Sequence, residues 1–195
     1  MATAATTLWA LGTVKSYLTV TDSTEDALIE QIADGATDLI EQETERQYVT
    51  RTLTEERDGN GVKDVGLHQW PIISVTSVKI KRTITDTSPE LIASTDYTVH
   101  KPTGRIRLHN TIFTVGFANC EFVYSAGLGA QDAAALPRSI YHAGLEIVKL
   151  IYDEKKTGAI AAGSIGLGPN TFMIRPEWPK QIRMVLQHSR RLRVA

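Results

Sequence analysis

The feature that most constrains the fold of this chain is a β-rich stretch set between two segments of helical periodicity. Apolar residues recur at helical spacing from Ser23 to about Gln47, and again from Pro137 to about Lys155. Between them, residues 50–129 hold short runs rich in β-branched and aromatic residues, separated by glycine and proline turns. This order predicts an α+β protein in which a large antiparallel β insert separates the first long helix from the second.

The first helical segment carries a start signal. Ser23 is followed three residues later by Asp26, a spacing that resembles a capping box and predicts a helix start at Ser23. One short helical turn is expected before it, over residues 14–18. The predicted helix has an apolar stripe made of Leu28, Ile29, Ile32, Ala33, Ala36, Leu39 and Ile40.

The middle of the chain predicts five or six short strands with frequent turns. The strands are expected at residues 50–57, 72–80, 97–99, 105–108, 112–115 and 120–125. The Asp-Gly-Asn-Gly sequence at residues 58–61 is a strong turn signal, and residues 83–94, which include Pro89, indicate a loop. Short strands joined this closely favour a mostly antiparallel sheet or a small barrel.

Helical periodicity returns in the last third of the chain. The helix from Pro137 to about Lys155 is followed by a glycine-rich, nearly uncharged loop at residues 157–170. Pro176 and Pro179 then open a last helix, so that three main helices are expected in all.

These elements divide the chain into three parts. Residues 1–49 form an N-terminal extension and the first long helix, and residues 50–129 form the β-rich insert. Residues 130–195 supply the C-terminal helices and the glycine-rich loop. The C-terminal helices are expected to join the first helix in one helical bundle, which makes a single structural unit of the two ends of the chain.

The net charge of −1 hides a gradient along the chain. Residues 1–67 carry a net −8, residues 68–135 a net +1, and residues 136–195 a net +6. An acidic front and a basic rear suit a subunit that contacts different neighbours at its two ends, or its own copies head to tail. Scatter of charge between solvated faces explains the same values equally well.

No pattern in the sequence is typical of catalysis or of a cofactor site. Cys120 is the single cysteine, which excludes an intramolecular disulfide and a cysteine-based metal cluster. In a strand its side chain would share one buried face with Phe122 and Tyr124. The five histidines lack metal-ligand spacing, and the glycines of residues 163–168 follow a helix instead of opening one. We therefore predict a protein that is not an enzyme and needs no cofactor or metal.

The apolar runs also predict no membrane contact. Charged residues interrupt every run well before the roughly 20 residues that a bilayer span needs. The first residues lack a basic leader, which favours synthesis inside the cell.

The arginines near the end of the chain are the strongest functional candidates. Arg183, Arg190, Arg191 and Arg193 lie on or beside the last helix, where they would contact phosphates or the acidic grooves of a partner. A solvated helix face is the simpler explanation of the same residues. Trp178, set between two prolines, is placed to fill a pocket of a neighbouring protein.

Several short motifs follow one another in a recognisable order. They are Gln69-Trp70-Pro71-Ile72, Asp96-Tyr97-Thr98-Val99, Thr103-Gly104-Arg105-Ile106, Tyr124-Ser125-Ala126-Gly127 and Leu136-Pro137. A helix ending in Ile40-Glu41 precedes them, and a helix from Pro179 to Arg191 closes the chain. Over residues 14–193 this order resembles the head–tail connector (adaptor) family of tailed bacteriophages.

The resemblance implies a structural adaptor in the head–tail neck of the virion, assembled in the host cytoplasm. Members of this family form a ring, usually of twelve copies, under the portal protein of the capsid. They extend the DNA channel and give the stopper, the tail-completion protein or the tail a docking surface. Gene transfer agents, which are domesticated phage-like particles, use similar adaptors.

The resemblance also suggests roles for particular residues. The residues expected to contact the portal are Trp178, Arg183, Arg190, Arg191 and Arg193. Lys155 and Lys156 are expected to face the channel, where weak attraction that ignores base sequence lets DNA slide. Two alternatives stay open: a stopper or tail-completion protein of the same neck, and a non-enzymatic nucleic-acid-binding module that uses the basic C-terminus.

Overall fold

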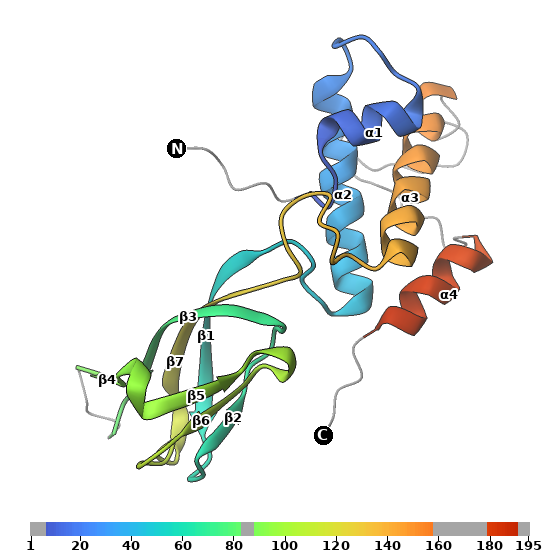
Figure 1. Cartoon of the computed structure of the whole chain (residues 1–195). Helices are drawn as coiled ribbons and strands as arrows, with labels where there is room; N and C mark the ends of the chain where they lie inside the picture. The colour runs from blue at the N-terminus through green and yellow to red at the C-terminus, as the bar shows by residue number, and fades with distance from the viewer. Residues whose placement is uncertain (1–6, 83–87, 158–178, 191–195) are drawn as a thin grey trace, which may run out of the picture. The chain divides into compact units, whose positions relative to one another are not determined.

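The computed structural model describes residues 7–82, 88–157 and 179–190, and it divides into two compact units (Figure 1). The described parts of residues 1–46 and 130–195 form a helical unit, and those of residues 47–129 form a β unit. The chain passes from one unit to the other twice, after residue 46 and after residue 129. The predicted α+β class, with a large antiparallel insert between the long helices, is confirmed.

Four helices make up the described part of the helical unit. They are α1 (Leu11–Leu18), α2 (Asp26–Thr44), α3 (Arg138–Thr157) and α4 (Lys180–Ser189). The two long helices α2 and α3 lie side by side, α1 contacts both, and α4 also contacts both (Figure 1). The two ends of the chain therefore share one helical core.

The core between the helices follows the apolar stripes of the sequence. Ile29, Ile32 and Ile40 of α2 are fully buried, as is Ile140 of α3. A buried segment before α1 completes this core, because the Leu8 backbone N–H donates to Thr37 Oγ1 over 3.1 Å and the indole of Trp9 is almost fully enclosed.

A glycine makes room for that indole. A Cβ atom placed on Gly144 of α3 would lie 2.3 Å from Cη2 and Cζ2 of Trp9 and 2.8 Å from Cδ1 of Ile40. Any side chain at this position would displace the ring. The glycine therefore permits α3 to approach Trp9 closely.

The predicted start of the first long helix is wrong by three residues. The helix α2 begins at Asp26 and not at Ser23, and its N-cap residue Glu25 makes no side-chain cap hydrogen bond. The physical reason is a competing turn: Oδ1 of Asp22 accepts hydrogen bonds from both the backbone N–H and the hydroxyl of Thr24. This turn holds the chain outside the helix until Asp26.

The helix α1 is longer than the single turn expected at residues 14–18, and a distant residue caps it. Oδ2 of Asp132 accepts hydrogen bonds from the Ala10 backbone N–H (3.0 Å) and from Oγ1 of Thr13 (2.9 Å). Oδ1 of Asp132 accepts a third from the hydroxyl of Tyr141, over 2.8 Å. A carboxylate at the N-terminus of a helix satisfies its free N–H groups.

The β unit contains two antiparallel sheets. The first has the order β1 (Arg51–Gly59), β7 (Gly116–Ala126), β3 (Ile72–Ile80) and β4 (Glu90–Leu91). The second has the order β2 (Asp64–Gly66), β6 (Arg105–Leu108) and β5 (Tyr97–His100). Short 3₁₀ turns at Ser94–Asp96 and Lys101–Thr103 flank β5. The strands β2 and β4 were not predicted from the sequence, because they are too short to show the alternation of apolar and polar residues that indicates a strand.

Both sheets contribute to one hydrophobic core. Cys120, Phe122 and Tyr124 of β7 are fully buried, which confirms the shared face predicted for them. Ile106 and Leu108 of β6 lie in the same cluster. Burial raises the pKa of the Cys120 thiol to about 11, so this group is held neutral.

The strand predicted at residues 112–115 is wrong. These residues are irregular, and the long strand β7 begins only at Gly116. Their backbone groups find partners outside a sheet ladder: the Phe113 N–H donates to the Val62 carbonyl over 2.9 Å, and the Thr114 carbonyl accepts from Nδ2 of Asn119 over 2.7 Å. Side chains and a neighbouring turn thus replace the expected strand pairing.

Candidate interaction surfaces

One face of the helix α4 packs against the other helices of the helical unit, and the opposite face is exposed to solvent. Ile182 and Leu186 are buried, whereas Arg183 and His188 are exposed. Met184 is 67% exposed, although it is a large apolar side chain. The ten residues of α4 include no acidic side chain, so its solvent face is basic with one apolar position.

Arg190, directly after α4, has a partner within the helical unit. Its Nη2 lies 2.7 Å from Oε1 of Glu45, the residue that caps the C-terminus of α2. The Arg190 side chain keeps 60% of its surface exposed, and the hydrogen bond that it donates to Glu45 raises the pKa of Arg190. The structure therefore places Arg183 on the solvent face of α4 and Arg190 directly after α4, beside the C-terminus of α2. Of the other predicted contact residues, Trp178, Arg191 and Arg193 lie outside the described residues.

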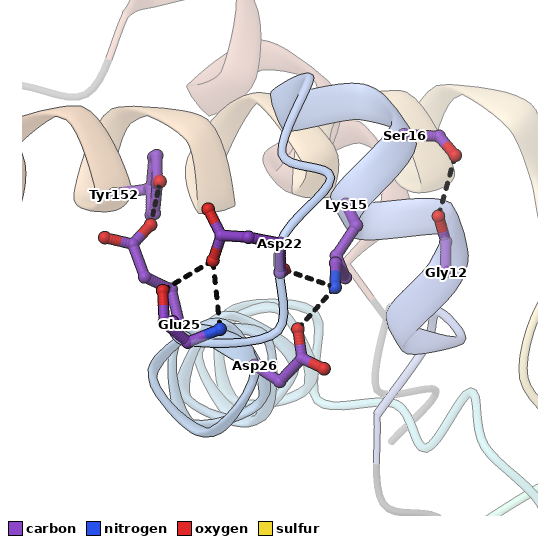
Figure 2. Close-up of polar contacts among 8 residues, drawn as sticks. Gly12, Lys15, Ser16, Asp22, Glu25, Asp26 and Tyr152 are labelled. Atoms are coloured by element: carbon purple, nitrogen blue, oxygen red, sulfur yellow. Dashed lines mark hydrogen bonds and ion pairs between the residues drawn. The ribbon is translucent and has the colours of Figure 1, made fainter.

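Charged side chains also join the helices α1 and α2 (Figure 2). Nζ of Lys15 lies 2.6 Å from Oδ1 of Asp26 and donates a second hydrogen bond to the Asp22 carbonyl over 2.7 Å. The ammonium is therefore held between the last turn of α1 and the first turn of α2.

A second ion pair joins α2 to α3 beside the first. Nζ of Lys156 lies 2.7 Å from Oε1 of Glu25, while the hydroxyl of Tyr152 donates to Oε2 of the same carboxylate. The hydrogen bond from Lys156 lowers the pKa of Glu25 and, in return, the pKa of Lys156 is raised. This role of Lys156 has no local signal in the sequence, because its partner Glu25 lies more than a hundred residues earlier in the chain.

The ion pair between Glu25 and Lys156 involves one of the two lysines that are expected to face DNA. Both Lys155 and Lys156 are exposed in the last turn of α3. Lys156 already has a carboxylate partner in its own chain, so its charge is partly compensated. The helical unit is otherwise acidic along α2, where Glu30, Asp38 and Glu43 are exposed.

The described residues give little support to other kinds of site. Over residues 7–82, 88–157 and 179–190, no group of three or more His, Cys, Asp or Glu side chains is arranged to hold a metal ion. The helices in these ranges do not combine the length and apolar character that a membrane span requires.

The family model described as "Head completion protein" matches residues 7–192, so this chain belongs to the head completion protein family. No curated protein matches the chain significantly.

Several solved structures share the fold. A chain from the structure titled "Neck of empty GTA particle computed with C6 symmetry" is 16% identical, with a TM-score of 0.67 over 96% of this chain and 92% of its own length. A chain from "Virion of native gene transfer agent (GTA) particle" has the same identity and TM-score and covers 100% of this chain and 95% of itself. A third, from "Neck of native GTA particle computed with C12 symmetry", has a TM-score of 0.66 at 16% identity and covers 96% of this chain and 91% of itself.

Proposed function

We propose that this chain is a structural subunit of the neck of a phage or phage-like particle, where it forms a ring under the portal protein and acts as the head–tail adaptor. One observation carries the proposal: a head completion family match over residues 7–192 coincides with a fold shared, over nearly the whole of both chains, with chains of gene transfer agent necks. Two of those structures were computed with sixfold and twelvefold symmetry, which supports a ring of twelve copies.

The charge distribution suits such a ring. A closed ring uses heterologous contacts, in which one flank of each subunit meets the opposite flank of the next. The helix α2 exposes acidic side chains, and α4 exposes basic ones. The two surfaces carry opposite charges, which suits a contact between different flanks of neighbouring copies, and the portal is the alternative partner of the basic surface.

The portal contact is assigned to the C-terminal part of the chain. Arg183 and Arg190 lie on the solvent side of α4 and directly after it. Trp178, Arg191 and Arg193 flank the helix in the sequence. Arginine is favoured at protein interfaces because its planar guanidinium binds carboxylates through two hydrogen bonds.

Charge reversal tests this assignment with purified portal rings. A variant with Arg190→Glu, Arg191→Glu and Arg193→Glu should fold, with only a small loss of stability from the broken ion pair between Arg190 and Glu45. It should lose most of its cosedimentation with portal rings. The matched control reverses three exposed basic residues elsewhere, Lys101, Arg105 and Arg138, and should bind normally. Equal binding by both variants would show that the C-terminal arginines do not hold the portal.

The same experiment separates the adaptor from the two other functions. A stopper or tail-completion protein should not bind the portal without an adaptor, so a natural chain that fails to bind favours that role. A nucleic-acid-binding module should instead bind duplex DNA with an affinity that falls steeply as salt rises. In the adaptor, Lys155 and Lys156 give passing DNA only a weak contact that does not depend on base sequence.

A further inference from the structure

One end of the β unit presents four large apolar side chains to solvent. The turn after β1 contributes Val62, and the segment before β7 together with its first residues contributes Ile112, Val115 and Phe117. Phe117 is 90% exposed and Val115 is 75% exposed, while Val62 and Ile112 are nearly half exposed. We call these four residues the apolar tip. Isolated surface apolar residues are common, but a group of this kind marks an interaction site.

The two segments of the apolar tip are joined to each other. The Gly61 N–H donates to the Phe113 carbonyl over 2.8 Å, and the Phe113 N–H donates to the Val62 carbonyl over 2.9 Å. A Cβ atom on Gly61 would lie 3.0 Å from Cγ2 of Val115, so the Val115 side chain lies against the turn. The segments that carry Val62, Ile112 and Val115 therefore lie side by side, and Phe117 follows Val115 by two residues.

The loop that carries the apolar tip is held by buried and charged groups. Oδ1 of Asn119 accepts from the Gly59 N–H over 2.7 Å, while its Nδ2 donates to the Thr114 carbonyl. Nη1 of Arg82 donates to the Ile112 carbonyl and to Oγ1 of Thr114, over 3.3 and 3.2 Å. These bonds fix the loop in advance, so a partner would bind it with little loss of conformational entropy.

The backbone of the next residue, Ala118, fixes the position of Phe117. The Ala118 N–H donates to Oδ1 of Asp58 over 2.7 Å, and Ala118 adopts a left-handed conformation with φ of 44°. Such a conformation is unfavourable for alanine. The neighbouring structure thus holds the backbone in the position that leaves the aromatic ring in solvent.

The size and charge of the apolar tip indicate its partner. Its exposed apolar area is on the order of 400 Å², given about 150–250 Å² for a large side chain. This is about half of the roughly 800 Å² that each partner buries in a stable free-standing complex. The apolar tip therefore suits a contact between molecules that other surfaces also hold together. It contains no charged side chain, which favours an uncharged apolar partner surface over nucleic acid.

We propose that the apolar tip docks on a second copy of this chain, the neighbouring subunit of the ring. This inference rests on the proposed function, because the ring supplies the other contacts that the limited area requires. Apart from α4, which is assigned to the portal, the helical unit of each copy exposes the large apolar side chains of Tyr17 on α1 and Leu150 on α3. Each copy therefore exposes the apolar tip and, on its helical unit, separate apolar side chains for a neighbour's tip to contact, so that two different surfaces meet as in a heterologous contact.

Site-specific photo-crosslinking in assembled particles tests the contact. Phe117 is replaced by benzoylphenylalanine, and particles that contain this variant are purified and irradiated. The expected product is an adduct of two copies, with twice the 21.5 kDa mass of the chain. The control carries the same photo-reactive group at Glu56, an exposed position on β1, and should give at least tenfold less of this adduct.

Each other result contradicts the proposal. An adduct between residue 117 and a different particle protein, equal adducts from both positions, or no adduct in particles that contain the chain would overturn the docking and leave the proposed neck function intact. Absence of the natural chain from purified particles would overturn the neck function, and the docking with it. A Phe117→Ser variant should fold normally and enter particles at least tenfold less well when its concentration is limiting.

Discussion

The close contact between Gly144 and Trp9 gives the most specific prediction about stability. In Gly144→Ala, the new methyl group would lie 2.3 Å from two carbons of an indole that is only 1% exposed. Overpacking of this kind costs about 1–3 kcal/mol. The upper part of that range applies because the obstacle is a rigid ring. Alanine recovers about 1 kcal/mol through its helix propensity. The net expectation is a loss of about 2 kcal/mol from the free energy of unfolding.

A second glycine provides the matched control. Gly12 lies in α1, and a Cβ atom placed on it would meet no other atom within 4 Å. Gly12→Ala should therefore be neutral or should stabilise the chain by up to about 1 kcal/mol, from helix propensity alone. The two variants make the same chemical change and are expected to have opposite effects.

Urea unfolding followed by circular dichroism at 222 nm measures both variants, because this signal reports mainly on the helical unit. For a unit of about 100 residues, a loss of 2 kcal/mol corresponds to a fall in melting temperature of roughly 10 °C. A Trp9→Phe substitution removes part of the ring that the new methyl group meets, so Gly144→Ala should cost less in that background. A Gly144→Ala chain as stable as the natural one would refute the packing argument.

Two other predictions concern polar groups. Asn119→Ala should destabilise the β unit by about 2–4 kcal/mol, because it leaves the buried Gly59 N–H and the Thr114 carbonyl without partners. Urea unfolding measures this loss, and a value below about 0.5 kcal/mol would contradict the prediction. The lowered pKa of Glu25 predicts a contribution to stability that is present above its unfolded pKa of about 4.3 and is lost as pH falls through the folded value. Between about pH 5 and pH 3 the free energy of unfolding of the natural chain should therefore fall more than that of Glu25→Gln. If the two free energies fall in parallel, the ion pair between Glu25 and Lys156 contributes nothing to stability.

The interior of each element was predictable from local patterns. The apolar stripes of α2 and α3 define which face of each helix is buried, because side chains three and four positions apart lie on one side of a helix. Alternation along β7 placed Cys120, Phe122 and Tyr124 together in the core for the equivalent reason in a strand. The order of these elements was also sufficient to predict the α+β class, whereas the family was indicated by the resemblance of the short motifs between residues 14 and 193.

The candidate surfaces were predictable only in part. The basic character of α4 can be read directly from its residues, but the ion pair between Arg190 and Glu45 cannot, because 145 positions separate the two side chains. The apolar tip gives no signal in the sequence either. Ile112, Val115 and Phe117 have the composition of a buried strand, and this similarity produced the wrong strand at residues 112–115.

The sequence alone determined the long helices and the longer strands and which of their faces are apolar, since these properties depend on spacing over a few residues. Only the tertiary structure decided where α1 begins, how the strands divide between two sheets, and which apolar side chains remain in solvent. The cap of α1 by Asp132 illustrates the reason, because a carboxylate 122 positions from the Ala10 N–H has no local pattern to announce it. Hydrogen bonds and contacts of this range form only when the whole chain has folded, and they override the local preference where the two disagree.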